Sequence, residues 1–173
     1  MRAFIYTLLI SCLLSGLVYA KADRPVMPSL EGRDLQGKKV RLDDLRGNVV
    51  VVSFWATWCG PCKKELTDLN TLLESKKEKG LRVLAISMDG PETVADIRGV
   101  VRRHKWKMPV IHDQNGGLTA VHNPRGSAPY TIYVDREGKM HSSHEGYSSG
   151  DRKAMVEKID RLLREAKFSG GSQ

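Results

Sequence analysis

A strand-like run that leads directly into two closely spaced cysteines constrains the fold of this chain more than any other feature. Residues Val49–Phe54 are almost wholly apolar, as is typical of a central strand buried on both faces. Residues Lys63–Lys79 carry leucines at helical spacing, which predicts a helix. Cys59 and Cys62 therefore lie where a buried strand passes into a helix.

This position gives the two cysteines a defined chemistry. The first N–H groups of a helix lack partners within the helix, and together with the helix dipole they stabilise an anion. We therefore expect Cys59 to be the exposed nucleophile, with its thiolate form stabilised. The two-residue spacer lets Cys62 reach back one helical turn and close a disulfide with Cys59. The pair is predicted to exchange electrons as a dithiol–disulfide couple.

Other uses of two such cysteines fit this chain less well. A structural zinc site needs four ligands, and no second cysteine pair follows Cys62. His141 and His144 are three residues apart in a predicted strand, so they point to opposite faces and make a poor metal pair. Haem attachment requires a histidine after the second cysteine, where this chain has Lys63. We expect no metal and no cofactor besides the redox disulfide.

The residues around the pair resemble a known family. Trp58-Cys59-Gly60-Pro61-Cys62 matches the thioredoxin active-site motif in full. Further matching segments, in chain order, are Leu42–Gly47, Phe54–Cys59, Leu84–Ser87, Gly126–Thr131 and Tyr133–Lys139. Together they resemble the thioredoxin-like thiol-disulfide oxidoreductases typified by TlpA and ResA, a periplasmic group related to AhpC/TSA and Redoxin sequences. The likeness covers residues 25–167, roughly.

The resemblance implies an α/β, thioredoxin-like fold. Its features are a central mixed β-sheet, helices on both faces of the sheet and an N-terminal β-hairpin extension. We expect the hairpin from Val26–Leu30 and Lys38–Leu42. The strands expected after it are 49–54, 81–88, 108–112, 130–135 and 139–145, and the helices are 61–79, one that begins near 91 with Val94 on its inner face, 117–122 and 151–167.

The first twenty residues differ in composition from the rest. Residues 3–20 are uncharged and rich in Leu and Ile, and Val18-Tyr19-Ala20 resembles a signal-peptidase site. We expect residues 1–20 to be a signal peptide. Two alternatives remain: retention of this segment as a membrane anchor, and lipid attachment at Cys12. All three imply export to the periplasm or to the outer face of the bacterial cytoplasmic membrane.

The length of the chain suits one domain. We expect residues 21–168 to form that domain, as a monomer, and residues 169–173 to be a disordered tail. The net charge is +8. The basic runs are dispersed and lack interleaved aromatic residues, so we expect no nucleic-acid partner. They are better explained by solvated helix faces or by attraction to anionic membrane surfaces.

Several residues are expected to support the cysteine pair. The resemblance implies that Pro129 forms a cis peptide bond with Ala128 and faces the two cysteines. The backbone of Ala128 could then pair with an extended substrate segment. Trp58, beside Gly60 and Pro61 of the motif, is expected to contribute a substrate-facing surface.

The acid that exchanges a proton with Cys62 is less clear from the sequence. Thioredoxins usually bury an Asp in the strand before the motif, where this chain has Ser53. Asp89 is the nearest acid after the following predicted strand. It could take the proton from Cys62 or cap the helix that begins near Pro91. Glu65 is expected on an exposed first helical turn, where it complements the helix dipole.

The resemblance implies an exported thiol-disulfide oxidoreductase of the protein-disulfide reductase type. Its expected substrates are protein disulfides and thiols, with apocytochrome c as one candidate, so that it would serve cytochrome c biogenesis and cell redox homeostasis. A membrane thiol-electron donor would recharge it. The direction of electron flow stays open.

Two other functions are weighed against this one. A peroxiredoxin-like thiol peroxidase requires a threonine three residues before its reactive cysteine, and that position here is Ala56. A non-catalytic thioredoxin-fold binding module would typically have lost one of the two cysteines, and both are present.

Overall fold

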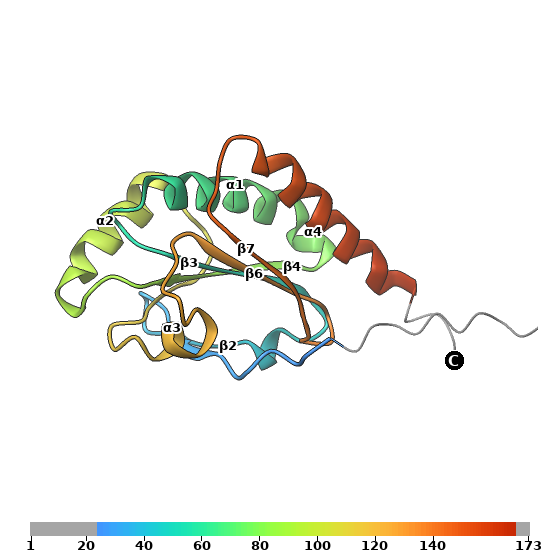
Figure 1. Ribbon diagram of the computed structural model, residues 1–173, viewed down its shortest axis with the longest axis horizontal. Coiled ribbons are helices and arrows are strands. Elements are labelled where there is room, and N and C mark those ends of the chain that lie inside the picture. The colour runs from blue at the N-terminus through green and yellow to red at the C-terminus, as the bar shows by residue number, and fades with distance from the viewer. Residues whose placement is uncertain (1–23, 169–173) are drawn as a thin grey trace, which may run out of the picture.

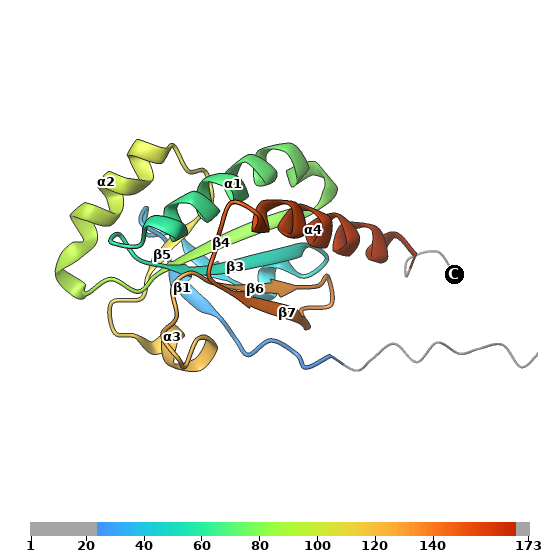
Figure 2. The same cartoon turned by 45° about the horizontal axis from the view of Figure 1, so that its top comes forward.

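A computed structural model describes residues 24–168 of the chain. The predicted signal peptide, Cys12 and the predicted tail lie outside the described residues. Five strands form one mixed sheet in the order β5-β4-β3-β6-β7 (Figures 1 and 2). Their bounds are β3 Val49–Trp55, β4 Leu81–Ser87, β5 Val110–His112, β6 Tyr130–Val134 and β7 Met140–Glu145. β3 runs parallel to β4 and antiparallel to β6, so the strand before the cysteines is central, as predicted.

The residues of β3 alternate between two apolar clusters. Its seven residues are all buried. Val49, Val51 and Trp55 belong to the cluster on one face of the sheet. The residues between them, Val50 and Phe54, belong to the cluster on the other face. Because successive side chains of a strand point to opposite faces, both faces of the sheet are covered.

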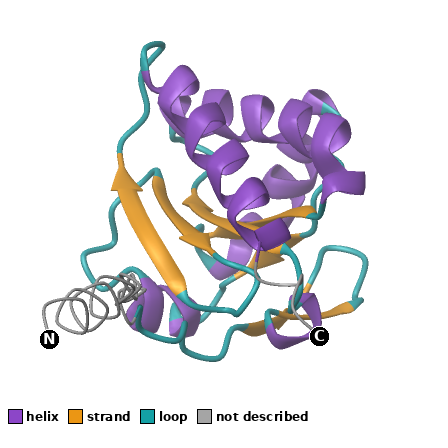
Figure 3. Ribbon diagram, turned by 90° about the vertical axis from the view of Figure 1, so that its right-hand side faces the viewer, coloured by secondary structure: helices purple, strands orange, loops and turns teal. Residues whose placement is uncertain are grey.

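The layers above and below the sheet follow from these clusters. The helices on one face are α1 Gly60–Lys76, α2 Val94–His104 and α4 Asp151–Phe168 (Figures 1 and 3). The other face carries α3 Gly117–His122 and a hairpin of β1 Glu31–Arg33 and β2 Lys39–Arg41 (Figure 1). The predicted architecture is confirmed: a thioredoxin-like mixed sheet with helices on both faces and an N-terminal hairpin.

The first strand of the hairpin was predicted in the wrong place. Residues 26–30 form no strand, and the strand begins at Glu31 instead. Pro25 and Pro28 have no N–H group, so this segment cannot donate a regular ladder of hydrogen bonds. Asp34 sets the register of the hairpin, because its carboxylate accepts hydrogen bonds from two backbone N–H groups of the turn.

The inner face of α2 also differs from the prediction at one position. Pro91–Thr93 form a 3₁₀ turn, and the α-helix begins only at Val94. Val94 is exposed at the first position of the helix, whereas Ile97 and Val100, further along the same helix, are buried as expected.

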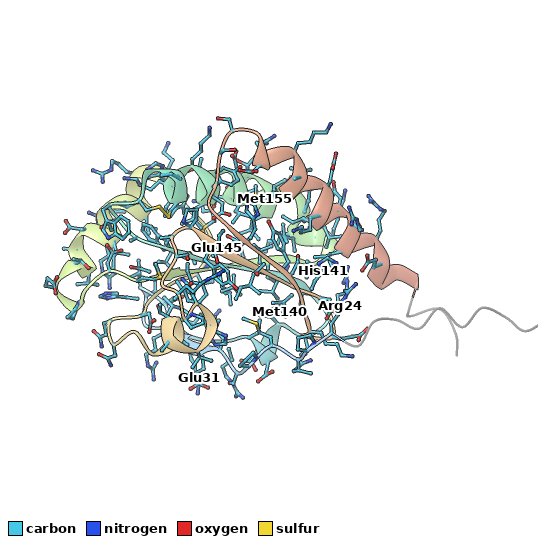
Figure 4. The ribbon with its side chains drawn as sticks, in the orientation of Figure 1. Arg24, Glu31, Met140, His141, Glu145 and Met155 are labelled. Carbon is cyan, nitrogen blue, oxygen red and sulfur yellow. A yellow bond between two sulfur atoms is a disulfide. The ribbon has the colours of Figure 1, made fainter. Side chains whose placement is uncertain are left out.

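The two ends of the described chain lie side by side. The Arg24 guanidinium forms ion pairs with Asp135 at 3.5 Å and with Glu165 of α4 at 3.8 Å. Figure 4 shows Arg24 beside His141 of β7. The end of the molecule that carries Arg24 lies near the C-terminal end of α4. The start of α1 lies at the opposite end of the molecule (Figure 1). Across residues 24–168, no helix is both long and apolar enough to cross a membrane.

Candidate redox active site

Cys59 and Cys62 form a disulfide at the start of α1, with their Cα atoms 5.3 Å apart. Cys59 is the N-cap residue of the helix, and the backbone N–H of Cys62 donates to its Sγ atom at 3.2 Å. An N–H group without a helical partner thus points at the sulfur, as predicted. The same contact would stabilise a thiolate on Cys59 once the disulfide is reduced.

The two sulfurs differ in accessibility, although less than predicted. Cys59 is only 4% exposed and Cys62 is fully buried, so the prediction of an exposed Cys59 is wrong for the disulfide form. Trp58 is 74% exposed, and Gly60 and Pro61 are exposed as well. A partner that reaches the disulfide therefore crosses this rim and meets Cys59 first.

A proline loop lies next to the same cluster of side chains. The Ala128–Pro129 peptide bond is cis, and Ala128 packs against the apolar cluster that contains both cysteines. Asn123 holds the preceding residue, because its side-chain amide donates to the Ser127 carbonyl at 2.8 Å and accepts from the Ser127 N–H at 3.2 Å. On the other side, the Pro129 carbonyl accepts a hydrogen bond from Gly146. The loop is therefore anchored on both sides of Ala128.

Glu65 is buried, which corrects the prediction of an exposed first turn. It is 1% exposed, and both carboxylate oxygens accept hydrogen bonds from hydroxyl groups of the sheet. Ser53 of β3 donates to Oε2 at 3.0 Å, and Thr131 of β6 donates to Oε1 at 2.7 Å. The sequence predicts Glu65 to be exposed and does not single out Thr131 as a site residue. A signal was present, because Glu65 shares the helical spacing of Cys62 and Leu69, which face the core.

The environment of Glu65 changes its acidity. Burial raises the pKa of its carboxyl group from 4.5 to about 7, against the hydrogen bonds from Thr131 and Ser53, which lower it. The negative charge of Asp151 raises it further. Residues three apart on a helix have Cβ atoms about 5–6 Å from each other, so Glu65 neighbours Cys62. Glu65 therefore lies one helical turn after the buried Cys62, with a raised pKa.

Asp89 has a different set of partners. Its carboxylate accepts hydrogen bonds from the Thr57 backbone N–H at 3.0 Å, from the Thr57 hydroxyl at 2.6 Å and from the Ser87 hydroxyl at 2.7 Å. It makes no capping hydrogen bond to the following 3₁₀ turn, so the predicted capping role is wrong. His112 fixes the same segment, with Nε2 at 3.0 Å from the Asp89 carbonyl oxygen. Asp89 therefore holds the chain two residues before Cys59.

The remaining aromatic and histidine residues have structural surroundings. Trp55 is buried in the cluster that contains the cysteines and packs edge-to-face on Trp106, with ring centroids 5.1 Å apart. His141 and His144 lie on β7. In the part of the chain that the structure describes, no three His, Cys, Asp or Glu side chains are grouped closely enough to hold a metal ion.

Several known proteins are similar to this chain in sequence. ResA of Bacillus cereus, a thiol-disulfide oxidoreductase, is 35% identical over 113 residues, which are 65% of this chain and 64% of the relative. ResA of Oceanobacillus iheyensis is 36% identical over 65% of this chain and 57% of its own. The chain thus spans less than two thirds of the length of these relatives.

Solved structures give the same picture. A candidate thiol:disulfide interchange protein DsbE from Chlorobium tepidum superposes with a TM-score of 0.75 at 27% identity, covering 81% of this chain and 96% of that one. The exposed lipoprotein thioredoxin of Streptococcus pneumoniae gives 0.65 at 28% identity, with 78% and 99% covered. The family model described as AhpC/TSA matches residues 25–143. The chain belongs to the AhpC/TSA family.

Proposed function

We propose that this protein is a thiol-disulfide oxidoreductase that exchanges electrons between its Cys59–Cys62 pair and protein disulfides. The observation that carries the proposal is the disulfide at the N-terminus of α1, with Cys59 nearly buried beneath an exposed rim and Cys62 fully buried. The relatives named as thiol-disulfide oxidoreductases support it.

The chemistry is written here in the direction of substrate reduction. The Cys59 thiolate attacks a substrate disulfide, forms a mixed disulfide and releases the first substrate sulfur as a thiolate. Cys62 then loses its proton and attacks the Sγ atom of Cys59. This step releases the second substrate sulfur and restores the Cys59–Cys62 disulfide, so that two electrons pass to the substrate.

Glu65 is the group best placed to accept the proton of Cys62. It lies one helical turn away, on the same buried side of α1, and its pKa of about 7 lets it bind and release a proton near neutrality. Asp89 was the predicted candidate for this step. Its carboxylate instead accepts hydrogen bonds from Thr57 and Ser87, and we assign it the positioning of the loop before Cys59.

The surface around Cys59 provides the docking contacts. Trp58, Gly60 and Pro61 form the exposed rim on one side. We assign the other side to Ala128, whose backbone would pair with an extended substrate segment beside Pro129. The buried side chain of Asn123 holds the backbone of Ser127, the residue before Ala128. This contact would keep the edge in place for an incoming substrate strand.

The proposal includes a cellular setting. Residues 1–20 direct export, and the domain at 21–168 works in the periplasm or at the outer face of the cytoplasmic membrane. Once residues 1–20 are removed, only Cys59 and Cys62 remain, so electrons come from another molecule. We infer a membrane thiol-electron donor. Reduction of the haem-binding cysteines of apocytochrome c, in cytochrome c maturation, is the candidate physiological reaction.

Trapping of the mixed disulfide tests the proposal and the two cysteine roles. The Cys62→Ser variant should form stable mixed disulfides with protein substrates through Cys59, whereas Cys59→Ser should form none. The wild-type protein should speed the reduction of insulin disulfides by dithiothreitol. Trapping by Cys59→Ser alone would reverse the roles, and no stimulation of insulin reduction would refute the proposed function.

A peroxide assay separates the proposal from the peroxidase alternative. Ala56 stands where a peroxidatic cysteine needs a threonine, and the hydroxyl of the adjacent Thr57 donates to Asp89. We therefore expect no turnover of hydrogen peroxide by the reduced protein. Turnover that depends on Cys59 would favour the peroxidase instead. A binding module would show neither activity.

A further inference from the structure

A small cavity lies on the α4 side of the sheet, with Glu65 on its wall. Its volume is about 40 Å³, and it is also lined by side chains of β6, β7 and α4. Glu65 is buried, whereas His144 and Ala154 on the same wall are exposed. Met155, labelled in Figure 4, is buried beside it in the apolar cluster that contains Cys62. The cavity thus connects the buried carboxyl group with the surface between β7 and α4.

The cavity is large enough and polar enough for water. A water molecule needs about 10–15 Å³ of such space and two to four polar partners. The Glu65 carboxylate accepts one hydrogen bond per oxygen, from Ser53 and from Thr131. A carboxylate has about four acceptor sites, so Glu65 can also accept a hydrogen bond from water in the cavity.

The titratable groups that face the cavity suit a route for a proton. Burial raises the pKa values of Tyr133 and Tyr147, so both hydroxyl groups stay protonated near neutrality. Asp151 and His144, which also line the cavity, are partly or fully exposed to solvent. Lys158 completes the wall, with its Nζ 4.6 Å from the ring centre of Tyr133. A proton on Glu65 thus has exchangeable groups between itself and solvent.

The two cysteines themselves are shielded from solvent. Cys62 is fully buried, and Cys59 is almost so. In the mixed disulfide a protein substrate lies over Cys59 and the rim around it, at the moment when Cys62 must lose its proton. The proton therefore has to leave on a side that the substrate does not cover.

We propose that the cavity between β7 and α4 is the hydrated route by which the proton that Cys62 transfers to Glu65 reaches solvent. This inference rests on the proposed function. One proton passes from the Cys62 thiol to Glu65 and then to water in the cavity. The two electrons leave separately, with the released substrate thiolates, which take their protons from solvent.

Chemical rescue with a small acid tests the route. Glu65→Ala removes the proton acceptor and enlarges the cavity, and insulin reduction should fall about 10- to 100-fold. Sodium formate is small enough to enter through the cavity, and it should restore at least a fifth of the wild-type rate. A second substitution, Ala154→Phe, places a ring at the exposed mouth and should abolish the rescue.

A matched variant controls for the added ring. Ala120 is exposed on α3, on the opposite face of the sheet from α4 (Figure 1), so Ala120→Phe should leave both the activity and the rescue unchanged. The route would be supported if formate rescues Glu65→Ala/Ala120→Phe but fails to rescue Glu65→Ala/Ala154→Phe. Absence of rescue, or equal rescue in both double variants, would overturn it. Failure of the wild-type protein to reduce insulin would instead refute the proposed function.

Infrared spectroscopy tests the same route with Glu65 in place. The carbonyl band of the protonated carboxyl group is assigned by its loss in Glu65→Gln, and its shift on transfer to D₂O reports exchange of the proton. Exchange should be slower in Ala154→Phe than in Ala120→Phe. Equal exchange rates would contradict a route through this cavity, even if Glu65→Ala does not fold.

Discussion

Glu65 and Asp89 are both buried acids near the cysteine pair, yet their surroundings differ. Glu65 projects from α1 into an apolar cluster and accepts hydrogen bonds only from two side-chain hydroxyl groups. Asp89 follows β4 and also accepts from a backbone N–H, that of Thr57. Few donors and burial favour the neutral form of an acid, whereas backbone contacts tie the chain in place. The first acid is suited to carrying a proton, the second to holding a loop.

The largest expected effect that separates the two acids is on the pH dependence of stability. The folded state raises the pKa of Glu65 from 4.5 to about 7, so between these values the folded protein retains a proton that the unfolded chain releases. The free energy of unfolding should therefore fall as the pH rises from 4.5 through 7 and level off above. A shift of this size corresponds to about 3 kcal/mol.

Chemical denaturation of matched amide variants measures this effect. Glu65→Gln cannot ionise, so its free energy of unfolding, relative to wild type, should increase by about 3 kcal/mol between pH 4.5 and pH 8. Asp89→Asn serves as the matched acid-to-amide control. A Glu65→Gln curve parallel to that of the wild type would remove the difference between the two acids.

The second effect concerns turnover. Without a proton acceptor beside Cys62, Glu65→Gln should reduce insulin disulfides about 10- to 100-fold more slowly at pH 7. The pH–rate profile should also lose its inflection near 7. Stopped-flow measurement of the step in which Cys62 releases the substrate localises the loss. A slower attack by Cys59 with unchanged release would point to a different role for Glu65.

Asp89→Asn should act chiefly on stability. An amide has one acceptor oxygen, and its NH₂ group would face the donors of Thr57 and Ser87, so the protein should lose about 1–3 kcal/mol of unfolding free energy. The rate of insulin reduction should change less than in Glu65→Gln, and the inflection near pH 7 should remain. Loss of that inflection would make Asp89 the proton acceptor after all.

The smallest effect is expected at the exposed rim. Trp58 is 74% exposed, so Trp58→Ala should change the unfolding free energy by no more than about 0.5 kcal/mol. Its contribution to docking should appear as a severalfold increase in KM for a protein substrate, with kcat nearly unchanged. A change in kcat alone would assign this residue to the chemical steps rather than to binding.

The sequence predicted those parts of the fold that local patterns determine. The apolar run of β3, the helix after the cysteines and the bounds of α3 follow from periodicity and turn residues. The first hairpin strand was misplaced because apolar residues near Pro25 and Pro28 suggested a strand that prolines cannot pair. In this segment the missing N–H groups of the prolines, and not the apolar side chains, determined where the strand begins.

The candidate site was predicted only in part, for a physical reason. The cysteine positions follow from one local motif. The burial of Glu65 depends on hydroxyl groups of two strands that are distant in the sequence, Ser53 and Thr131, which the antiparallel pairing of β3 and β6 places directly opposite each other. A charged residue on a helix is usually solvated, so this pairing, together with the helical spacing that Glu65 shares with Cys62, explains why Glu65 points inward.

A direct titration of Glu65 tests whether its carboxyl group exchanges a proton near neutrality. The chemical shift of its side-chain carboxyl carbon, assigned by comparison with Glu65→Gln, can be followed by NMR as a function of pH in the protein with the Cys59–Cys62 disulfide. We predict a pKa of about 7, because burial outweighs the two hydroxyl hydrogen bonds. Titration near 4.5, the ordinary value for a glutamate, would contradict its role as the acid that exchanges a proton with Cys62.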